Sequence, residues 1–331
     1  RFSLFYYAVL DKLHFLFYWF IAKREDIIKF SQGGGQPNIS QAIIRSLRFQ
    51  LPTIDEQRHI IEYVKKETSQ LEELIKKYQQ YIDLLKEKRI ALISHVVTKG
   101  LDPDVKMKDS GSELIETIPF HWDFKKLKYC VDNKKGAIKT GPFGSQLKAS
   151  DMELGDVKVY NQETVLLKDI THGENYVSYE KYSELKAFEV EPGDILITTR
   201  GSIGQTFIVA ENAEKGILHP CLLRIQVNKE RILKEYLTLI IEQAKLIWEQ
   251  LLIMSCATTI EVIYQDNMKN VLLPLPPVDE QEKILEYLKT ETSRIDNLME
   301  KINKQIDLLN EYKTSLISHA VTGKIDVRGV V

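Results

Sequence analysis

Lysines gather in one short stretch of this 331-residue chain, although the formal charge of the whole chain is only −2. The stretch runs from Lys125 to Lys148 and holds seven lysines against one aspartate, Asp132, with Asp123 just before it. It ends on the segment TGPFGSQLK, in which two glycines permit close approach of the backbone, while a hydroxyl and an amide can bind phosphate or adenine. A plain Gly-Pro turn between two strands is the alternative interpretation. The candidate nucleic-acid contacts in this segment are Lys139, Thr140, Gly141, Phe143, Gly144, Ser145, Gln146 and Lys148.

A second candidate is the segment GDILITTRGSIG, from Gly193 to Gly204, which has the pattern of a turn, a buried strand and another tight turn. Arg200 stands at the end of the expected strand. An arginine there can bind guanine through two hydrogen bonds or clamp a phosphate, or it can bind loop carbonyls in a purely structural role. The other candidate contacts are Thr198, Thr199, Gly201 and Ser202 in this segment, Asn161 and Gln162 after an earlier β-rich run, and Gln36 and Asn38 near the N-terminus.

Residues for catalysis are scarce. Metal-dependent cleavage needs paired acidic groups and a lysine, and Asp104, Glu184 and Lys186 are a weak candidate set because such triplets arise readily in a highly charged chain. No GxxxxGK[ST] loop is present to bind a nucleoside triphosphate. His95 and His319 have no second histidine or cysteine at ligand spacing, so we predict no metal site, no cofactor and no enzymatic activity.

The cysteines and the N-terminal residues bear on where the protein works. Cys130, Cys221 and Cys256 are widely spaced, which is typical of a reducing cytoplasm. The apolar run at the N-terminus contains Asp11, Lys12 and His14, and charge inside a membrane helix is costly. We therefore expect an aromatic-rich helix of a cytoplasmic protein there rather than a membrane span.

These candidates must be positioned by the rest of the chain, whose dominant feature is a duplication. Residues 55–98 return as residues 279–322 at a constant offset of 224, without a gap and with about half of the positions identical. Each copy follows a proline and begins with two acidic residues, which suits a helix N-terminus. About 40 helical residues at ~1.5 Å each make a rod of roughly 60 Å.

Apolar residues in each copy alternate at steps of four and three. Such a narrow seam predicts a coiled coil with one partner helix, and each copy is the obvious partner of the other. The seam residues predicted are Ile60, Val64, Leu71, Leu74, Tyr78, Leu85 and Leu92 in the first copy, and Ile284, Leu288, Ile295, Leu298, Ile302, Leu309 and Leu316 in the second.

Between the two copies, short β-rich runs alternate with turns and are followed by a helical stretch from about 230 to 252. Residues 99–117 are rich in Gly, Pro, Asp and Ser, and we expect a loop or linker there. The fold class predicted is mixed α+β, with globular α/β domain structure plus two long helices in an antiparallel coiled coil.

Several motifs of this region occur in a characteristic order: HWDFKKL at 121–127, TGPFGSQLKASD at 140–151, GDILITTRGSIGQ at 193–205, HPCLLRI at 219–225 and LPLPPVDEQ at 273–281. With the repeated helix, this set resembles the specificity subunit of a type I restriction-modification enzyme. The resemblance implies two target-recognition domains that each read half of a bipartite DNA site. It also implies that the paired helices hold these domains apart and dock two methyltransferase subunits, and through them restriction subunits.

The resemblance suggests a division of the chain into four parts. Residues 1–52 would be the C-terminal remnant of a first target-recognition domain, and 53–105 the first helix with its linker. Residues 106–276 would form a second, complete recognition domain, and 277–331 the second helix and tail. A coiled-coil scaffold without DNA reading is the main alternative, but it leaves the basic segment without a role.

Overall fold

The computed structural model describes residues 13–30, 39–152, 155–255 and 262–329. The chain divides into two compact units. Unit 1 comprises Arg1–Lys86 and Ile295–Val331, and unit 2 comprises Glu87–Arg294. The two longest helices, α4 (Ile54–Lys99) and α10 (Val278–Val321), contribute residues to both units.

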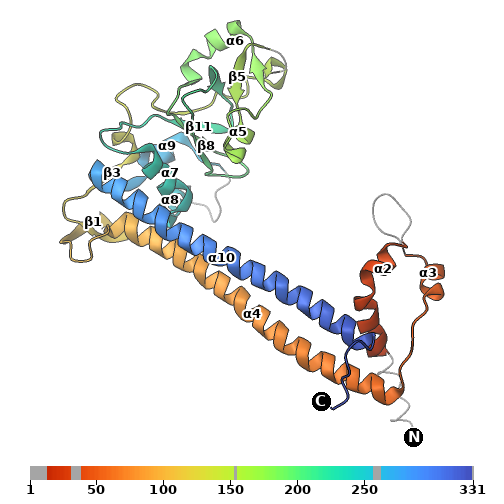
Figure 1. The fold of residues 1–331 in the computed structure, drawn as a ribbon. Coiled ribbons are helices and arrows are strands. Elements are labelled where there is room, and N and C mark those ends of the chain that lie inside the picture. Colours follow the sequence, from red (N-terminus) through yellow and green to blue (C-terminus); the bar gives the residue numbers. More distant parts are fainter. Residues whose placement is uncertain (1–12, 31–38, 153–154, 256–261, 330–331) are drawn as a thin grey trace. The chain divides into compact units, whose positions relative to one another are not determined.

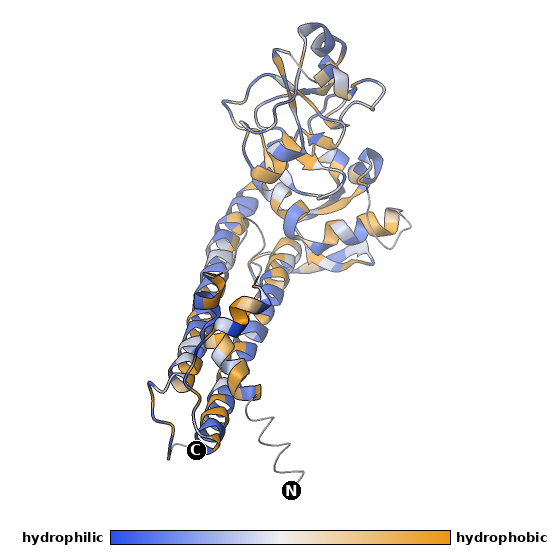
Figure 2. Cartoon of the chain, turned by 90° about the vertical axis from the view of Figure 1, so that its right-hand side faces the viewer, coloured by the Kyte–Doolittle hydropathy of each residue, from blue (hydrophilic) through white to orange (hydrophobic). Residues whose placement is uncertain are grey.

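Within unit 1, α4 and α10 pack against each other in opposite directions (Figure 1). Ile61 and Val64, near the start of α4, share a buried cluster with Leu316 and Ala320, near the end of α10. Lys313 Nζ lies 3.4 Å from Glu72 Oε1 across the same pair. Figure 2 shows polar and apolar residues alternating along both helices, as expected for helices that bury only one stripe. The predicted antiparallel coiled coil is confirmed.

The seam differs from the prediction at one position of each copy. Leu74 and Leu298 are 38% and 37% exposed, whereas Ile82 and Ile306, which we did not predict, are buried. Steps of four and three from the buried Ile61 and Val64 pass through Thr68, Leu71 and Ile75, and so they miss Leu74 by one residue. The prediction stepped three residues from Leu71 to Leu74, where the structure steps four residues to Ile75.

The remainder of unit 1 consists of short helices. Residues 13–22 are helical, followed by α2 (Arg24–Ile28) and α3 (Gln41–Ser46). Phe15 and Trp19 are buried against the first turns of α4 and the end of α10. The expected aromatic-rich helix is thus present over the described residues, with only one of its sides buried.

Unit 2 is built on small sheets. Its strands are β1 (Met107–Ser112), β2 (Ile115–Pro119), β3 (Asp123–Lys126), β4 (Ile138–Thr140), β5 (Val157–Tyr160), β6 (Tyr176–Val177), β7 (Glu189–Val190), β8 (Ile195–Thr198), β9 (Thr206–Ile208), β10 (Gly216–Leu218), β11 (Leu222–Ile225) and β12 (Leu272–Leu275). The strand orders are β6-β5-β10-β7 and β4-β11-β8-β9, with the separate pairs β1-β2 and β12-β3. Among these pairings only β5 and β10 run parallel.

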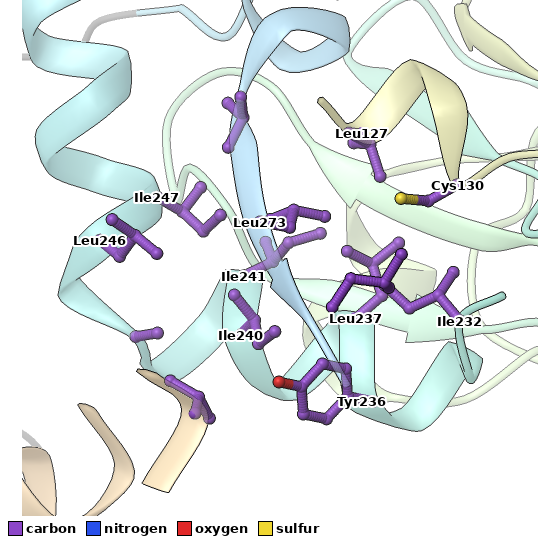
Figure 3. Close-up of a cluster of buried hydrophobic side chains, with 14 of the residues drawn as sticks. Leu127, Cys130, Ile232, Tyr236, Leu237, Ile240, Ile241, Leu246, Ile247 and Leu273 are labelled. Atoms are coloured by element: carbon purple, nitrogen blue, oxygen red, sulfur yellow. The ribbon is translucent and has the colours of Figure 1, made fainter. Parts of the chain in front are cut away.

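Helices close the core of unit 2. They are α5 (Gln162–Leu167), α6 (Tyr179–Glu184), α7 (Lys234–Gln243), α8 (Lys245–Ser255) and α9 (Gln265–Asn270), with 3-10 turns at Leu127–Tyr129, Ala149–Met152 and Lys186–Phe188. Apolar residues of α7 and α8 pack around Leu273 of β12, next to Leu127 and Cys130 (Figure 3). Burial raises the pKa of the Cys130 thiol to about 11, so this cysteine behaves as a core residue.

The β-rich runs and the helical stretch before residue 252 are found where the sequence predicts them, and the mixed α+β class is confirmed. The expected linker over residues 99–117 is partly wrong, because β1 and β2 form an antiparallel hairpin there. Gly111, with a φ of 74°, lies in the irregular part of this hairpin between Asp109 and Ser112. The hairpin could not be recognised from hydropathy, because β1 consists largely of small and polar residues.

Candidate nucleic-acid interface

Five chain segments meet where β4, β5, β8 and β10 end in unit 2. The amide of Gly141, just after β4, donates to Leu222 O at 2.8 Å, and His219, just after β10, donates to Tyr160 O at 2.9 Å. Thr199, just after β8, donates to Cys221 O at 2.9 Å, and Ile263 donates to Thr199 O at 3.0 Å. The last residue of β5 and the segments after β4, β8 and β10 are therefore tied together by backbone hydrogen bonds.

The segment after β4 is a rigid turn. A Cβ on Gly141 would lie 2.1 Å from His219 O, so only glycine allows this approach. The amide of Phe143 donates to Gln146 Oε1 at 3.1 Å, and Gln146 in turn donates its amide to Phe143 O at 2.7 Å. Pro142 and Leu147 are buried on either side, whereas Phe143 itself is 80% exposed. The turn thus holds a large apolar side chain out in solvent.

The turn after β8 carries Arg200. Its carbonyl accepts a hydrogen bond from Gln162 Nε2 at 3.1 Å, and its backbone bridges to Val262. Gly204, with a φ of 79°, lies so close to Trp248 that a Cβ would be 2.0 Å from the indole ring. Arg200, Gly201 and Ser202 are exposed at the tip of the turn. The exposed guanidinium of Arg200 is thus carried by a backbone that Gln162 and Val262 hold in place.

Two titratable side chains of this surface, Lys139 and His219, have lowered pKa values. The Lys139 ammonium lies 4.3 Å from the centroid of the Phe188 ring, and burial, with Arg224 and Lys135 nearby, lowers its pKa. Burial also lowers the pKa of His219. Its Nδ1 accepts the amide of Cys221 at 3.2 Å, which requires that nitrogen to be unprotonated. His219 therefore acts here as a neutral clamp between segments.

Four of the predicted contact residues have structural duties. Thr198 and Thr199 are buried, and their hydroxyls donate to the carbonyls of Ser202 and Cys221. Asn161 caps α5, with its Oδ1 accepting the amide of Thr164 at 3.2 Å. Gly141 is buried against the backbone. These four residues shape the surface, and we do not carry forward the prediction that they contact DNA.

The remaining predicted contacts fall into two groups. Phe143, Gly144, Ser145, Gln146 and Lys148 are exposed on or beside the first turn, while Gln162 connects α5 to the second. Gln36 and Asn38 lie outside the described residues. The structure thus brings the two main predicted segments together through the 219–222 segment.

Two residues of the site were missed by sequence reasoning. His219 was noticed only as part of a motif, and Gln265 lies upstream of the helix repeat described above, in a segment that corresponds to residues before the first helix at the same offset of 224. Gln265 Oε1 accepts the amide of Thr140 at 2.9 Å and so orients the first turn. The repeat held a signal, because Gln41 stands at the equivalent position of the first copy and both residues begin a short helix.

A buried polar cluster fixes the opposite ends of the same strands. Arg224 donates through Nη2 to Gly136 O at 2.9 Å, and its Nε lies 3.8 Å from Asp194 Oδ2. Gln226 donates to Asp194 Oδ1 at 2.8 Å. Burial raises the pKa of Asp194 despite these partners and lowers that of Arg224. The cluster is structural, since a buried charge without its partner is strongly destabilising.

Over the described residues, no group of three or more potential ligands is arranged to hold a metal ion. Within the same part of the chain, every helix is too short or too polar to cross a bilayer.

The model of one protein family matches residues 5–83 and 137–308, and its description reads "Type I restriction modification DNA specificity domain". The chain belongs to this family. Its relatives include the type I restriction enzyme MjaVIII specificity subunit of Methanocaldococcus jannaschii, with 27% identity over 97% of this chain and 72% of the relative. The chain spans 40% to 63% of four other curated relatives.

Solved structures show the same fold. A chain from a structure described as the basis of complex assembly and conformational transition of the type I R-M system matches with a TM-score of 0.67. Its identity is 16%, over 94% of this chain and 71% of that chain. The HsdS subunit from Thermoanaerobacter tengcongensis matches with a TM-score of 0.50 at 16% identity, over 94% and 70% of the two chains. The resemblance stated from the motifs is confirmed at the level of the family.

Proposed function

We propose that this specificity-family chain is a non-catalytic DNA-recognition subunit and that its recognition domain at 106–276 reads one half of a bipartite target. The observation that carries the proposal is the convergence of the two predicted turns. One exposes Phe143 and the other exposes Arg200, and each is held by backbone bonds to the 219–222 segment or its neighbours. Side chains on rigid elements can discriminate between bases because little ordering is needed on binding.

The two turns are assigned different tasks. Arg200 is the candidate for direct readout of a guanine, because its guanidinium offers two parallel donors and its backbone is fixed. Phe143 is the candidate for apolar contact with a thymine methyl group or for insertion beside a base step. Lys148 and Ser145 are the candidates for phosphate contact, which positions the protein without specifying sequence.

A pair of substitutions tests the assignment of Arg200. Arg200→Ala should cost ~1–3 kcal/mol of binding to the preferred duplex and relax the preference at one base pair. Arg294→Ala is the matched control, since Arg294 is an exposed arginine of α10 that pairs with Glu291. Binding to a randomised duplex pool, followed by sequencing of the bound fraction, gives the readout. Equal weakening on all sequences would make Arg200 a phosphate contact and remove it from the readout.

The alternative of a scaffold that does not read DNA predicts a different dependence on salt. Phosphate contacts release counterions, so the affinity of a reader for duplex DNA falls steeply between about 50 and 200 mM salt. A scaffold has no phosphate contacts to lose. Fluorescence anisotropy with the full chain and a labelled duplex separates the two, and absence of salt-sensitive binding at low salt would overturn the proposed function.

The helices are assigned the partner-binding role. We propose that α4 and α10 dock two methyltransferase subunits, with restriction subunits joining through them, and that the helix pair sets the distance between two recognised half-sites. The support is the confirmed coiled coil together with the names of the relatives, which are restriction enzyme subunits. Insertion of one heptad into each helix at equivalent positions should lengthen the preferred spacer without changing either half-site. An unchanged spacer preference would contradict this role.

A further inference from the structure

Residues 262–265 are bonded to both of the turns that are proposed to contact DNA, the first after β4 and the second after β8. The amide of Ile263 donates to Thr199 O at 3.0 Å, where the second turn begins. Two residues later, Gln265 Oε1 accepts the amide of Thr140 at 2.9 Å, where the chain enters the first turn. This short segment therefore holds the two turns together.

Tyr264 stands between these two bonds and is turned toward solvent. Its backbone is extended, with a φ of −88° and a ψ of 141°, and successive side chains of an extended backbone point to opposite sides. Ile263 is 2% exposed, whereas Tyr264 is 61% exposed. The backbone of Val262 also bridges to that of Arg200. A large aromatic ring is thus held out in solvent on a fixed backbone, as Phe143 is on the first turn.

The side chain of Tyr264 does not cap the helix that it begins. Tyr264 is the N-cap residue of α9, a position that favours Ser, Thr, Asp and Asn because their side chains accept a helix amide. Tyr264 makes no such bond. At the equivalent position of the repeat, Ser40 caps α3 by accepting the amide of Ile43 at 3.3 Å. The second copy thus has an exposed ring where the first has a helix cap.

The repeat shows which positions of this segment are shared by the two copies. At the offset of 224, residues 263–265, with the sequence IYQ, correspond to residues 39–41, with the sequence ISQ. Two domains that read different half-sites need the same support for the backbone but different side chains at the bases. A phosphate contact carries no sequence information and has no need to differ. The difference at Tyr264 therefore favours a base contact over a phosphate contact.

The charge beside Tyr264 also disfavours phosphate as its partner. Asp266, two residues later, is exposed, and its Oδ1 lies 3.1 Å from Lys269 Nζ within the same short helix. A carboxylate repels a nearby phosphate, whereas base edges in the major groove include amino groups that donate to a carboxylate. Both the repeat and the local charge thus point to a base edge.

We propose that Tyr264 is a third DNA-contacting side chain, whose ring packs against the methyl group of a thymine next to the base pair that Arg200 reads. This inference rests on the proposed function, because it names a further contact of the same recognition domain. The thymine methyl group is the apolar feature of the major groove. A tyrosine ring covers a large apolar area while few torsions become ordered on binding.

Two substitutions of Tyr264 test the contact in the full chain. Tyr264→Ser removes the ring, so the preference for thymine at one position of the half-site should fall about tenfold. Tyr264→Phe keeps the ring and should keep that preference. Sequencing of the duplexes bound from a randomised pool measures both variants. The affected position should be next to the position that Arg200→Ala relaxes, and equal losses in the two Tyr264 variants would overturn the ring contact.

The thymine methyl group is tested from the side of the DNA. Replacing that thymine by uracil removes only the methyl group and should weaken binding by the unchanged chain about fourfold, as expected for one buried carbon. The same replacement should have no effect on binding by the Tyr264→Ser chain, because the ring that covers the methyl group is gone. A loss of equal size with both chains would contradict the contact.

Thermal unfolding separates a DNA contact from a structural role. A serine in this place can cap α9 as Ser40 caps α3, so Tyr264→Ser should keep or raise the Tm while it loses the thymine preference. A lower Tm with an unchanged preference would make Tyr264 a structural residue and overturn the proposal.

Tyr179→Ala is the matched control. Tyr179 is 59% exposed at the start of α6, which carries none of the proposed contacts, so this variant should change neither affinity nor preference. If Arg200→Ala alters the preference and Tyr264→Ser does not, this inference fails while the proposed function stands. Equal weakening on every sequence in Tyr264→Ser has the same meaning. Absence of salt-sensitive DNA binding by the unchanged chain overturns both.

Discussion

Residues 48–57 and 272–281 are two copies of one sequence pattern that have ended in different surroundings. Gln57 and Gln281 show the difference most directly, because both side chains are buried. Gln281 accepts the amide of Leu233 at 2.8 Å and donates to the carbonyls of Arg231 and Pro276, each at 2.9 Å. Gln57 keeps one of these bonds, to Pro52 O at 2.7 Å, while its Oε1 has no partner among the described residues.

The acidic residues of the two first turns differ in the same way. Glu56 closes a capping box with Thr53, at 2.9 Å from the Thr53 amide. The second copy has Pro277 in place of Thr53, and proline offers neither a hydroxyl nor an amide N–H. Glu280 is therefore free to bind His121 at 2.8 Å and Trp122 at 3.0 Å. Equivalent residues of a repeat thus take different partners according to what packs beside them.

The largest difference in the free energy of unfolding should be seen between variants of residues 272–275 and variants of residues 48–51. Leu273→Ala should lower the free energy of unfolding by ~3 kcal/mol, because it leaves a cavity in a closed core. Leu51→Ala, in the other copy, should change it by no more than ~0.5 kcal/mol, as for an exposed side chain. Urea unfolding of both variants provides the comparison, and equal losses would show that the two copies are packed alike.

The buried glutamines should differ next. Gln281→Leu should cost ~2 kcal/mol, because one amide and two carbonyls lose their partner inside the protein. Gln57→Leu should cost only ~1 kcal/mol, since it frees one carbonyl, that of Pro52, and removes an Oε1 that is already unpaired. Hydrogen exchange at the Leu233 amide is the direct measurement. Protection that survives Gln281→Leu would mean that the amide has another acceptor.

Helix capping gives a smaller effect that is confined to the first copy. Thr53→Ala should destabilise the start of α4 by ~1 kcal/mol. Thr53→Ala and Glu56→Ala should be strongly non-additive, because the two side chains form one capping box. Pro277→Ala in the second copy is the control, as Glu280 is engaged elsewhere. Simple additivity in a double-mutant cycle measured by thermal unfolding would rule the box out.

The smallest expected effect depends on pH and should appear only in unit 2. Burial holds the pKa of His219 below its ordinary value, so below about pH 6.5 the unfolded chain takes up a proton that the folded chain refuses. The contribution of His219 is therefore present above that pH and is lost as the pH falls toward the lower folded pKa. His219→Asn keeps an acceptor for the Cys221 amide without titrating.

Unfolding measured from pH 8 to pH 5 should thus lose stability less steeply in His219→Asn than in the unchanged chain, by under ~1 kcal/mol at pH 5. Identical slopes would mean that His219 is protonated without cost.

Much of this architecture could be predicted from the sequence. The repeat led to the antiparallel helix pair, and alternating apolar runs located strands such as β8 and β11. The hairpin of β1 and β2 could not be predicted, because residues such as Ser110 and Gly111 carry no hydrophobic alternation. The seam prediction failed at Leu74 because Leu74 and Ile75 are adjacent apolar residues, and only the packed helices show which of them is turned outward.

The candidate site was predicted by segment and only in part by residue. Arg200 and Phe143 are exposed on their turns, as a contact residue must be. Thr198 and Thr199 share the same local chemistry but are buried, with hydroxyls bound to carbonyls of residues that follow them in the chain. The local sequence cannot distinguish exposed contact residues from buried structural ones, because exposure depends on which distant segment packs against a residue.

The sequence by itself determined the local elements of this protein: two long helices, their caps and seam, and the short strands between them. Propensity, periodicity and capping act over a few residues, and so they are written in the chain. Only the tertiary structure decided that residues 272–275 form a buried strand, while residues 48–51 form no strand among the described residues. The physical reason is that a strand is completed by backbone hydrogen bonds to another segment, and no property of its own residues supplies that partner.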